Sequence, residues 1–202
     1  MKKCILIFGT FNPITNAHIS LGLLAKALYK DSDIYFVIAK TSFLQDWKHY
    51  DNKDILSEDA RLKLCKEAVA EYDYMHILDV ELTDVVDGKT YNTVKYIKES
   101  LHYEEVYIIC GTDKLTELHQ WYRVDDLVTE VKFLVVQRDY FNIQHLPPFV
   151  QQYRDKFEIF TPPTTLQEVS STKIRNAFNE HNLEYIKEYV PKNVYLYYKS
   201  LV

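Results

Sequence analysis

The chain has 202 residues, of which 47% are hydrophobic and 26% are charged, and its formal net charge is −5. This balance is typical of a globular protein, and the length predicts one domain over residues 1–202. The hydrophobic content excludes proteins that are too polar to bury a core. No apolar stretch approaches the ~20 residues of a membrane-spanning helix, and no basic block indicates nucleic-acid binding. The N-terminus lacks signal-peptide character, so we expect a cytoplasmic protein. Its three dispersed cysteines predict neither a disulfide framework nor a metal site.

Apolar runs alternate with helical periodicity along the chain. Six runs are predicted as strands: residues 4–8, 34–39, 75–80, 106–110, 133–136 and, as a short sixth, 157–160. Helices between them are indicated by apolar residues at helical spacing: Leu21, Leu24, Ala25 and Leu28; Leu62, Cys65 and Val69; Val94, Ile97 and Leu101. Ser57, followed by two acidic residues, is the expected start of the second helix.

Strands separated by helices in this way form βαβ units. The sequence therefore predicts an α/β fold with a largely parallel sheet and helices on both faces. Ligands of such folds bind beyond the carboxyl ends of the strands, where the strand order reverses. Two segments follow strands at such ends: Gly9-Thr10 and Gly111-Thr112-Asp113.

The first candidate site is the segment from Phe8 to His18, which follows the first strand. Gly9 permits a close approach of the backbone, Pro13 stiffens the turn, and Thr15 is a suitable helix N-cap. His18 would lie in the first helical turn, where free amides and the helix dipole favour an anion. The segment predicts a phosphate site, although an ordinary strand-to-helix turn has the same pattern.

The second candidate site is Ser170-Ser171-Thr172-Lys173-Ile174-Arg175. Ser171 or Thr172 is the expected N-cap of a helix, and Arg175 lies on the same face as Thr172. Hydroxyls, amides and a guanidinium in one place suit phosphate oxygens, whereas a capped helix with a solvated arginine is the plainer alternative. Two such sites predict a polyphosphate held at both ends. With only 4 glycines and no Walker-type run, P-loop kinases fit poorly.

Together these residues resemble the nicotinate and nicotinamide mononucleotide adenylyltransferases of the nucleotidyltransferase superfamily. The resemblance rests on segments 9–18, 90–93, 110–115, 121–122 with 133–138, 170–175 and 189–191. It implies a Rossmann-like nucleotidyltransferase fold. It also implies adenylyl transfer from ATP to nicotinate mononucleotide, which gives deamido-NAD and pyrophosphate in NAD biosynthesis. Thr15 stands where many bacterial members have histidine, and a Thr-x-x-His form occurs in eukaryotic members.

The resemblance implies two catalytic residues, His18 at the α-phosphoryl group and Arg175 at the leaving pyrophosphate. The other implied ATP contacts are Gly9, Thr10, Phe11, Thr15, Ser171, Thr172 and Lys48. The implied mononucleotide contacts are Thr90, Asp113, Trp121 and Tyr122, with Trp121 stacked on the pyridine ring. Mg²⁺ would accompany ATP by bridging its phosphates. Lys40 is an alternative candidate for this phosphate contact, but the spacing favours Lys48.

Alternative functions stay open at this point. Nicotinamide mononucleotide is a second possible acceptor, although segments 90–93 and 121–122 favour the nicotinate form. A sibling such as phosphopantetheine adenylyltransferase or a cytidylyltransferase is disfavoured by the chain's length and by Trp121. A nucleotide sensor without turnover is disfavoured because both His18 and Arg175 are present. The expected partners are ATP and a pyridine mononucleotide, without nucleic acid or membrane, and a homo-oligomer stays possible.

Overall fold

A six-stranded parallel sheet lies at the centre of the computed structural model, which describes residues 2–42, 55–137, 145–161 and 169–202. The strand order is β3-β2-β1-β4-β5-β6, and every neighbouring pair is parallel. The strands are β1 (Lys3–Gly9), β2 (Ser32–Ile38), β3 (Met75–Leu78), β4 (Glu105–Gly111), β5 (Val131–Val136) and β6 (Phe157–Phe160). The predicted α/β fold and all six predicted strands are confirmed.

The strand order reverses between β1 and β4. These two strands pair directly, with Ile7 opposite Ile109, so Gly9 and Gly111 end neighbouring strands at the same edge of the sheet. A crevice between the two outgoing loops is the usual ligand site of this topology. The predicted placement of both glycine-containing segments at this edge is therefore confirmed.

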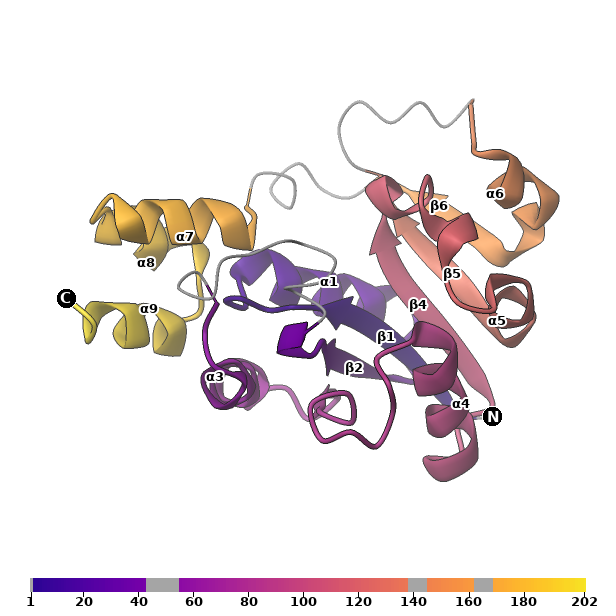
Figure 1. The fold of residues 1–202 in the computed structure, drawn as a ribbon, viewed down its shortest axis with the longest axis horizontal. Helices are drawn as coiled ribbons and strands as arrows, with labels where there is room; N and C mark the ends of the chain where they lie inside the picture. The colour runs from indigo at the N-terminus through magenta and orange to yellow at the C-terminus, as the bar shows by residue number, and fades with distance from the viewer. Residues whose placement is uncertain (1, 43–54, 138–144, 162–168) are drawn as a thin grey trace.

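Helices cover both faces of the sheet (Figure 1). One core joins Ile5 and Ile7 of β1 to helices α1 (Asn16–Leu28), α3 (Glu58–Val69), α7 (Ser171–Asn179), α8 (Leu183–Tyr189) and α9 (Lys192–Lys199). The other joins Cys4 and Leu6 to α4 (Thr90–Ser100), α5 (Val124–Glu130) and α6 (Pro148–Gln152). Short 3-10 helices, η2 (Thr112–Lys114), η3 (Leu118–Gln120) and η4 (Arg154–Lys156), complete the described elements. Because alternate residues of β1 enter opposite cores, that strand is buried on both faces.

The predicted helices form, and the structure shows which sides of α1 and α3 are buried. In α3, Ser57 is the N-cap and accepts from the backbone of Ala60, as expected. Its buried side includes Arg61 and Leu64, whereas Leu62 is only partly buried. In α1, Ile19, Gly22 and Ala25 are buried and Leu28 is 49% exposed. Periodicity therefore located both helices, whereas the neighbouring elements determine which of their apolar residues are buried.

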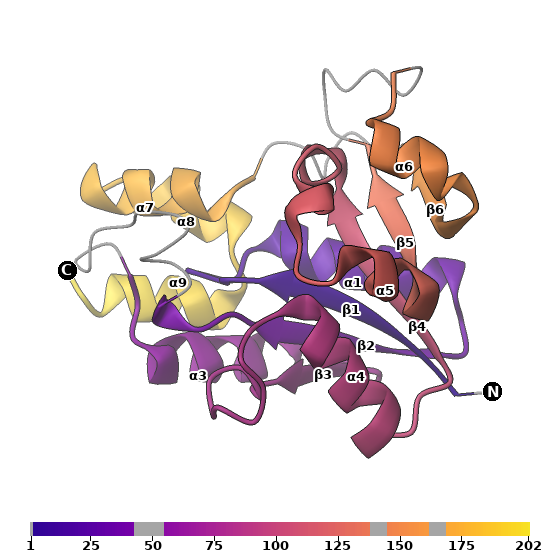
Figure 2. The same ribbon diagram turned by 45° about the vertical axis from the view of Figure 1, so that its right-hand side comes forward.

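The three C-terminal helices lie together at the side of the molecule toward which β1 points (Figures 1 and 2). Their buried residues Ile174, Ile186 and Val194 belong to the same core as β1 and α1. This packing brings the start of α7 to the carboxyl edge of the sheet. One domain over residues 1–202 stays a prediction, with which this shared core agrees.

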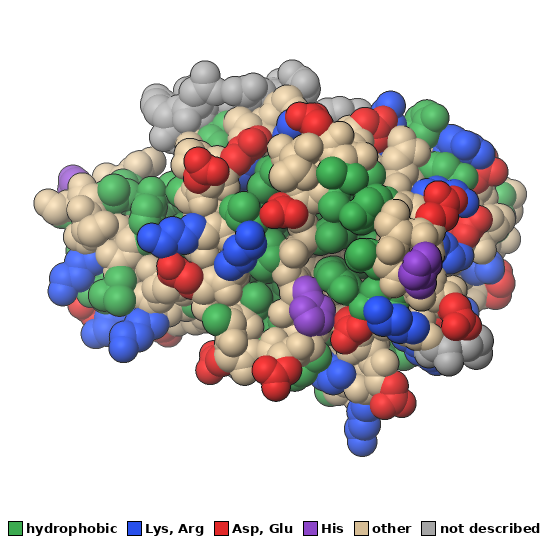
Figure 3. Space-filling model, turned by 90° about the horizontal axis from the view of Figure 1, so that it is seen from below, with side chains coloured by type: hydrophobic (Ala, Val, Ile, Leu, Met, Phe, Trp, Pro, Cys, Tyr) green, Lys and Arg blue, Asp and Glu red, His purple; other side chains and the backbone are tan. Residues whose placement is uncertain are grey.

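Surface charges of both signs are interspersed on the face seen in Figure 3, which suits the small net charge of −5. Across the described ranges, none of the helices has both the length and the apolar character needed to cross a membrane. Buried Cys4 and Cys65 behave as small apolar residues, and burial raises the pKa of each thiol to about 12.

Candidate active site

The loop after β1 is buried and closely packed. Phe11 is 1% exposed, has a left-handed backbone with φ of 43°, and packs edge-on against His18 with 5.1 Å between ring centroids. A Cβ atom on Gly9 would lie 2.7 Å from two carbons of the Phe11 ring. Glycine is therefore required here by the neighbouring aromatic ring, a reason that the sequence pattern did not indicate.

His18 and Thr15 form a reciprocal cap at the start of α1. Thr15 is the N-cap residue, and its backbone N–H donates to Nδ1 of His18 at 3.0 Å. The Thr15 hydroxyl lies 2.9 Å from the same nitrogen. Because Nδ1 accepts the backbone hydrogen, the proton of a neutral His18 ring resides on Nε2. The predicted N-cap is confirmed, and it also fixes the orientation of the histidine.

Helix α7 begins beside the β1–α1 loop. Its N-cap is Ser170, whose hydroxyl accepts from the backbone of Lys173 at 3.2 Å. The predicted cap at Ser171 or Thr172 is therefore wrong. Ser171 instead donates its hydroxyl hydrogen to the carbonyl of Pro13 at 2.8 Å, and Thr172 Oγ1 accepts from Arg175 at 3.2 Å.

Arg175 makes the second link between these distant segments. Its Nη1 donates to the backbone carbonyl of Asn12 at 2.9 Å. Asn12 is fully buried, and its side-chain Oδ1 also accepts from the backbone of Leu56 at 2.9 Å. The loop that leads to His18 and the first turn of α7 are thus joined directly. The structure brings together the two segments that the sequence analysis assigned to one polyphosphate.

The candidate mononucleotide residues lie on the β4 side of the sheet. Asp113 is exposed within η2, directly after β4, and Gly111 occupies the N-cap position of that short helix. Thr90 is the first residue of α4, and the preceding Lys89 lies over the Tyr122 ring at 4.6 Å. The half-buried Trp121 packs against the core on this face. The contact between Lys89 and Tyr122 therefore places Tyr122 beside the start of α4, where Thr90 lies.

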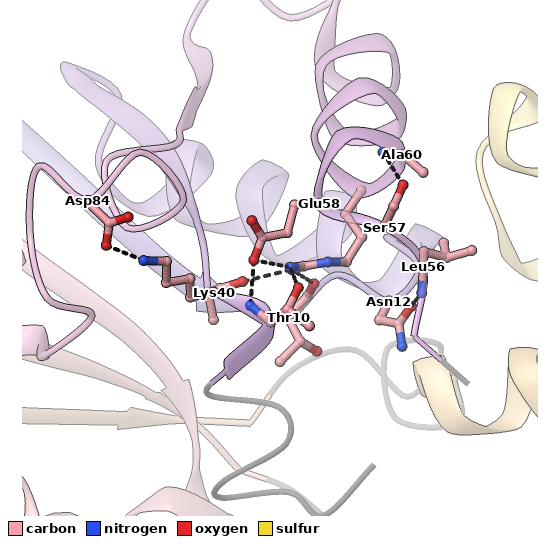
Figure 4. A network of polar contacts seen from close by, with 11 residues as sticks. Thr10, Asn12, Lys40, Leu56, Ser57, Glu58, Ala60 and Asp84 are labelled. Carbon is pink, nitrogen blue, oxygen red and sulfur yellow. Dashed lines mark hydrogen bonds and ion pairs between the residues drawn. The ribbon is translucent and has the colours of Figure 1, made fainter. Parts of the chain in front are cut away.

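Of the two candidate phosphate-binding lysines, the structure describes only one. Lys48 lies outside the described residues. Lys40 follows β2 and pairs with Asp84, as Figure 4 shows. Within the described parts of the chain, no cluster of three or more His, Cys, Asp or Glu side chains is suited to hold a metal ion.

Two residues that hold this site were not singled out from the sequence. Asn12 ties the loop to both Arg175 and Leu56, and Arg61 of α3 donates to the carbonyls of Thr10 and Ala39. A signal for Arg61 was present, because it shares helical spacing with the apolar Leu64 and Cys65. A charged residue on a buried stripe requires polar partners.

Comparisons with known proteins agree with this architecture. The model of the cytidylyltransferase-like family matches residues 6–177. A Staphylococcus epidermidis protein named probable nicotinate-nucleotide adenylyltransferase is 32% identical over 201 residues, covering 98% of this chain and 95% of that protein. A Clostridium tetani protein of the same name is 27% identical, covering 96% and 95%.

Solved structures show the same fold. The nicotinic acid mononucleotide adenylyltransferase of Plasmodium falciparum, complexed with APC, matches with a TM-score of 0.76 at 20% identity, over 98% of this chain and 94% of that one. The same protein complexed with NaAD matches with a TM-score of 0.74, at the same identity and coverage. The family model and the near-complete match to the Staphylococcus epidermidis relative show that the chain belongs to the cytidylyltransferase-like family, among the nicotinate-nucleotide adenylyltransferases.

Proposed function

We propose that the protein transfers the adenylyl group of ATP to nicotinate mononucleotide, forming the nicotinate dinucleotide deamido-NAD and releasing pyrophosphate. The observation that carries this proposal is the junction of the β1–α1 loop with α7, made by Ser171 at Pro13 and by Arg175 at Asn12. It gathers helix N-termini, hydroxyls and a guanidinium where the strand order reverses, which suits a triphosphate. The names of the relatives supply the acceptor.

The reaction needs no covalent intermediate on the enzyme. An oxygen of the mononucleotide's 5′-phosphate attacks the α-phosphorus of ATP, and the bond from that phosphorus to the oxygen bridging toward the β-phosphate breaks. The electron pair of that bond leaves with pyrophosphate. Catalysis of such a transfer consists mainly of positioning and of stabilising charge on the phosphoryl oxygens. We propose Mg²⁺ as part of the ATP substrate, because phosphate oxygens are its usual ligands.

We propose His18 and Arg175 as the catalytic residues. With Nδ1 held by the backbone N–H of Thr15, His18 donates the hydrogen on Nε2 to an α-phosphoryl oxygen. Arg175 neutralises charge on the departing pyrophosphate, with the hydroxyls of Ser171 and Thr172 beside it. Gly9, Thr10, Phe11 and Thr15 shape the loop against the nucleotide, and Lys48 stays a candidate phosphate ligand.

We propose that the mononucleotide lies on the β4 side. Trp121 would stack on the pyridine ring, Tyr122 and Thr90 would lie near its carboxylate, and Asp113 would contact ribose. The proximity of Lys89 to Tyr122 supports this placement, since it joins the start of α4 to the segment that contains Trp121.

Parallel assays test the proposal. Purified protein with Mg²⁺ and ATP is offered nicotinate mononucleotide, its amide and phosphopantetheine, while pyrophosphate and the adenylylated product are measured. We expect turnover with the nicotinate form. Turnover with phosphopantetheine alone, or ATP binding without product from any acceptor, would contradict it.

The proposed role of His18 is tested in the same assay. His18→Ala should lower kcat by about 10²-fold or more, the usual loss when a group that stabilises developing charge is removed. His76→Ala is the matched control, because His76 lies near the amino end of β3 and interacts with Asp33. An unchanged kcat in His18→Ala would remove His18 from the catalytic set.

A further inference from the structure

Among the residues that the structure describes, Arg61 is the largest side chain that is completely buried, with no exposed surface. It lies in the first turn of α3, where its Nη1 donates to the carbonyl of Thr10 at 2.9 Å and to that of Ala39 at 2.7 Å. Nη2 donates to the hydroxyl of Thr41 at 3.2 Å. One guanidinium thus joins the loop after β1 to the segment after β2.

The two carbonyls lie where the β1–β2 ladder stops. The last register pair is Gly9 with Ile38, and the backbone of Ala39 donates to Gly9 at 2.9 Å. Beyond that point the two chains follow different courses, and Arg61 donates to the next carbonyl on each. The guanidinium therefore fixes the distance between the outgoing loops where backbone pairing no longer does.

The charge of Arg61 is balanced only in part. Glu58 Oε1 lies 3.8 Å from Nη2, and the same oxygen accepts from the backbone of Thr41 at 2.7 Å, so Glu58 contacts both Arg61 and the segment after β2 (Figure 4). Nε of Arg61 has no hydrogen-bond partner among the residues that the structure describes. Burial lowers the pKa of Arg61. Such a charge costs several kcal/mol to bury, so an apolar side chain would serve packing better.

The loop that Arg61 holds is the one that leads to His18. From the α7 side, Arg175 and Ser171 bind two later carbonyls of the same loop, those of Asn12 and Pro13. The loop is therefore fixed from both sides, by α7 and by α3. Loss of the α3 contact would let Thr10 move relative to β2 while the α7 contacts persist.

On the basis of the proposed function, we propose that Arg61 is a positioning residue for adenylyl transfer, which holds the β1–α1 loop in register with β2 without touching substrate. Misplacement by about 1 Å of groups around a reacting centre lowers turnover by about 10²-fold. The mononucleotide lies on the β4 side of the proposed site, away from Arg61. Its KM should therefore stay unchanged when Arg61 is replaced.

Three variants test this role. Arg61→Ala removes all three hydrogen bonds, and Arg61→Lys keeps the charge but loses the planar fork that spans two carbonyls. Val69→Ala is the matched control, because it removes buried methyl groups from the far end of the same helix. For each, kcat and both KM values are measured with ATP and nicotinate mononucleotide, ATP affinity is measured by calorimetry, and the free energy of unfolding is measured in urea.

We expect kcat to fall by about 10²-fold in Arg61→Lys and further in Arg61→Ala, with the mononucleotide KM unchanged. Added guanidinium at low millimolar concentration should restore part of the turnover of Arg61→Ala and leave Val69→Ala unaffected. If Arg61→Ala does not fold, Arg61→Lys decides. The proposal would be overturned if Arg61→Lys kept the wild-type kcat. It would also be overturned if Val69→Ala lost as much kcat as Arg61→Lys while the two variants had equal free energies of unfolding.

The outcome is distinguishable from a failure of the proposed function. If the unmodified protein binds ATP but does not adenylylate nicotinate mononucleotide, the proposed function fails. The calorimetric ATP affinity of the variants then still reports on Arg61. Weaker ATP binding in Arg61→Lys than in Val69→Ala would support a positioning role, and equal affinities would refute it.

Discussion

Replacement of Gly9 by alanine probes the packing beneath the proposed catalytic loop. The new Cβ would lie 2.7 Å from two ring carbons of Phe11 and 3.2 Å from a third. Carbon atoms prefer separations of about 3.5–4.0 Å, so ring and strand must separate by roughly 1 Å. With 1% exposure the ring cannot swing into solvent. We expect Gly9→Ala to lower the free energy of unfolding by about 1–3 kcal/mol, the usual cost of overpacking.

The same displacement should reduce activity, because the Phe11 ring packs against the ring of His18. Urea unfolding and turnover of ATP with nicotinate mononucleotide measure both effects. Gly22→Ala in α1 is the matched control. Its Cβ would meet the terminal methyl of Met75 at 2.8 Å, a flexible group that can rotate away, and the Cζ atom of the buried Phe36 ring at 3.2 Å, which requires a smaller shift than the 2.7 Å contacts at Gly9. Alanine also favours the helix by about 1 kcal/mol, so we expect little net change.

A double-mutant cycle isolates the cause. In the Phe11→Leu background the ring is absent, so Gly9→Ala should cost at least about 1 kcal/mol less than in the unmodified protein. Equal costs in the two backgrounds, or a neutral Gly9→Ala, would refute the reasoning that the ring requires glycine at this position.

Three further variants test other contacts. Ser171→Ala removes the bond to Pro13 and should lower unfolding free energy by about 1 kcal/mol while raising the KM for ATP, measured by urea titration and initial rates. Trp121→Ala should raise the mononucleotide KM about tenfold at nearly constant kcat, since aromatic stacking contributes about 1–3 kcal/mol; an unchanged KM would remove Trp121 from the site. Burial raises the pKa of Glu81 to about 7, although its hydrogen bond from Thr93 opposes this. The folded state therefore binds the carboxyl proton of Glu81 more tightly than the unfolded state does. As the pH rises from about 4.5 to 7, the free energy of unfolding should fall by at most about 3 kcal/mol because of this group. In urea titrations, Glu81→Gln should flatten that pH dependence.

The strands could be predicted because each is a short apolar run that ends at a polar or glycine residue. Both faces of the sheet are covered, so the whole strand from Cys4 to Ile7 is apolar and stands out from its surroundings. The start of α3 at Ser57 was equally clear, because capping depends on local chemistry. Local signals of this kind predicted the alternation of strands and helices, and this alternation favours a parallel sheet.

Contacts between distant segments were the part that local patterns could not determine. Ser170, Ser171 and Thr172 are all competent caps, and only the position of Pro13 decides that Ser171 donates elsewhere and leaves the cap to Ser170. The sequence likewise could not show that Gly9 at the end of β1 makes room for Phe11, because the path of the following loop depends on its neighbours. Resemblance to a family located these residues, whereas the structure gave the reasons for them.

The carbonyl groups of the β1–α1 loop bear on how so buried a segment would face the proposed triphosphate. Exposed carbonyl oxygens repel a triphosphate, and a loop with few glycines cannot turn them all aside. Here the carbonyls of Thr10 and Asn12 accept from the guanidinium groups of Arg61 and Arg175, and that of Pro13 accepts from a serine hydroxyl of α7. Two of the three donors carry positive charge, so the contacts that fix the loop also make its surroundings favourable to phosphate. Structural support and electrostatic preparation of the proposed site would therefore come from the same side chains.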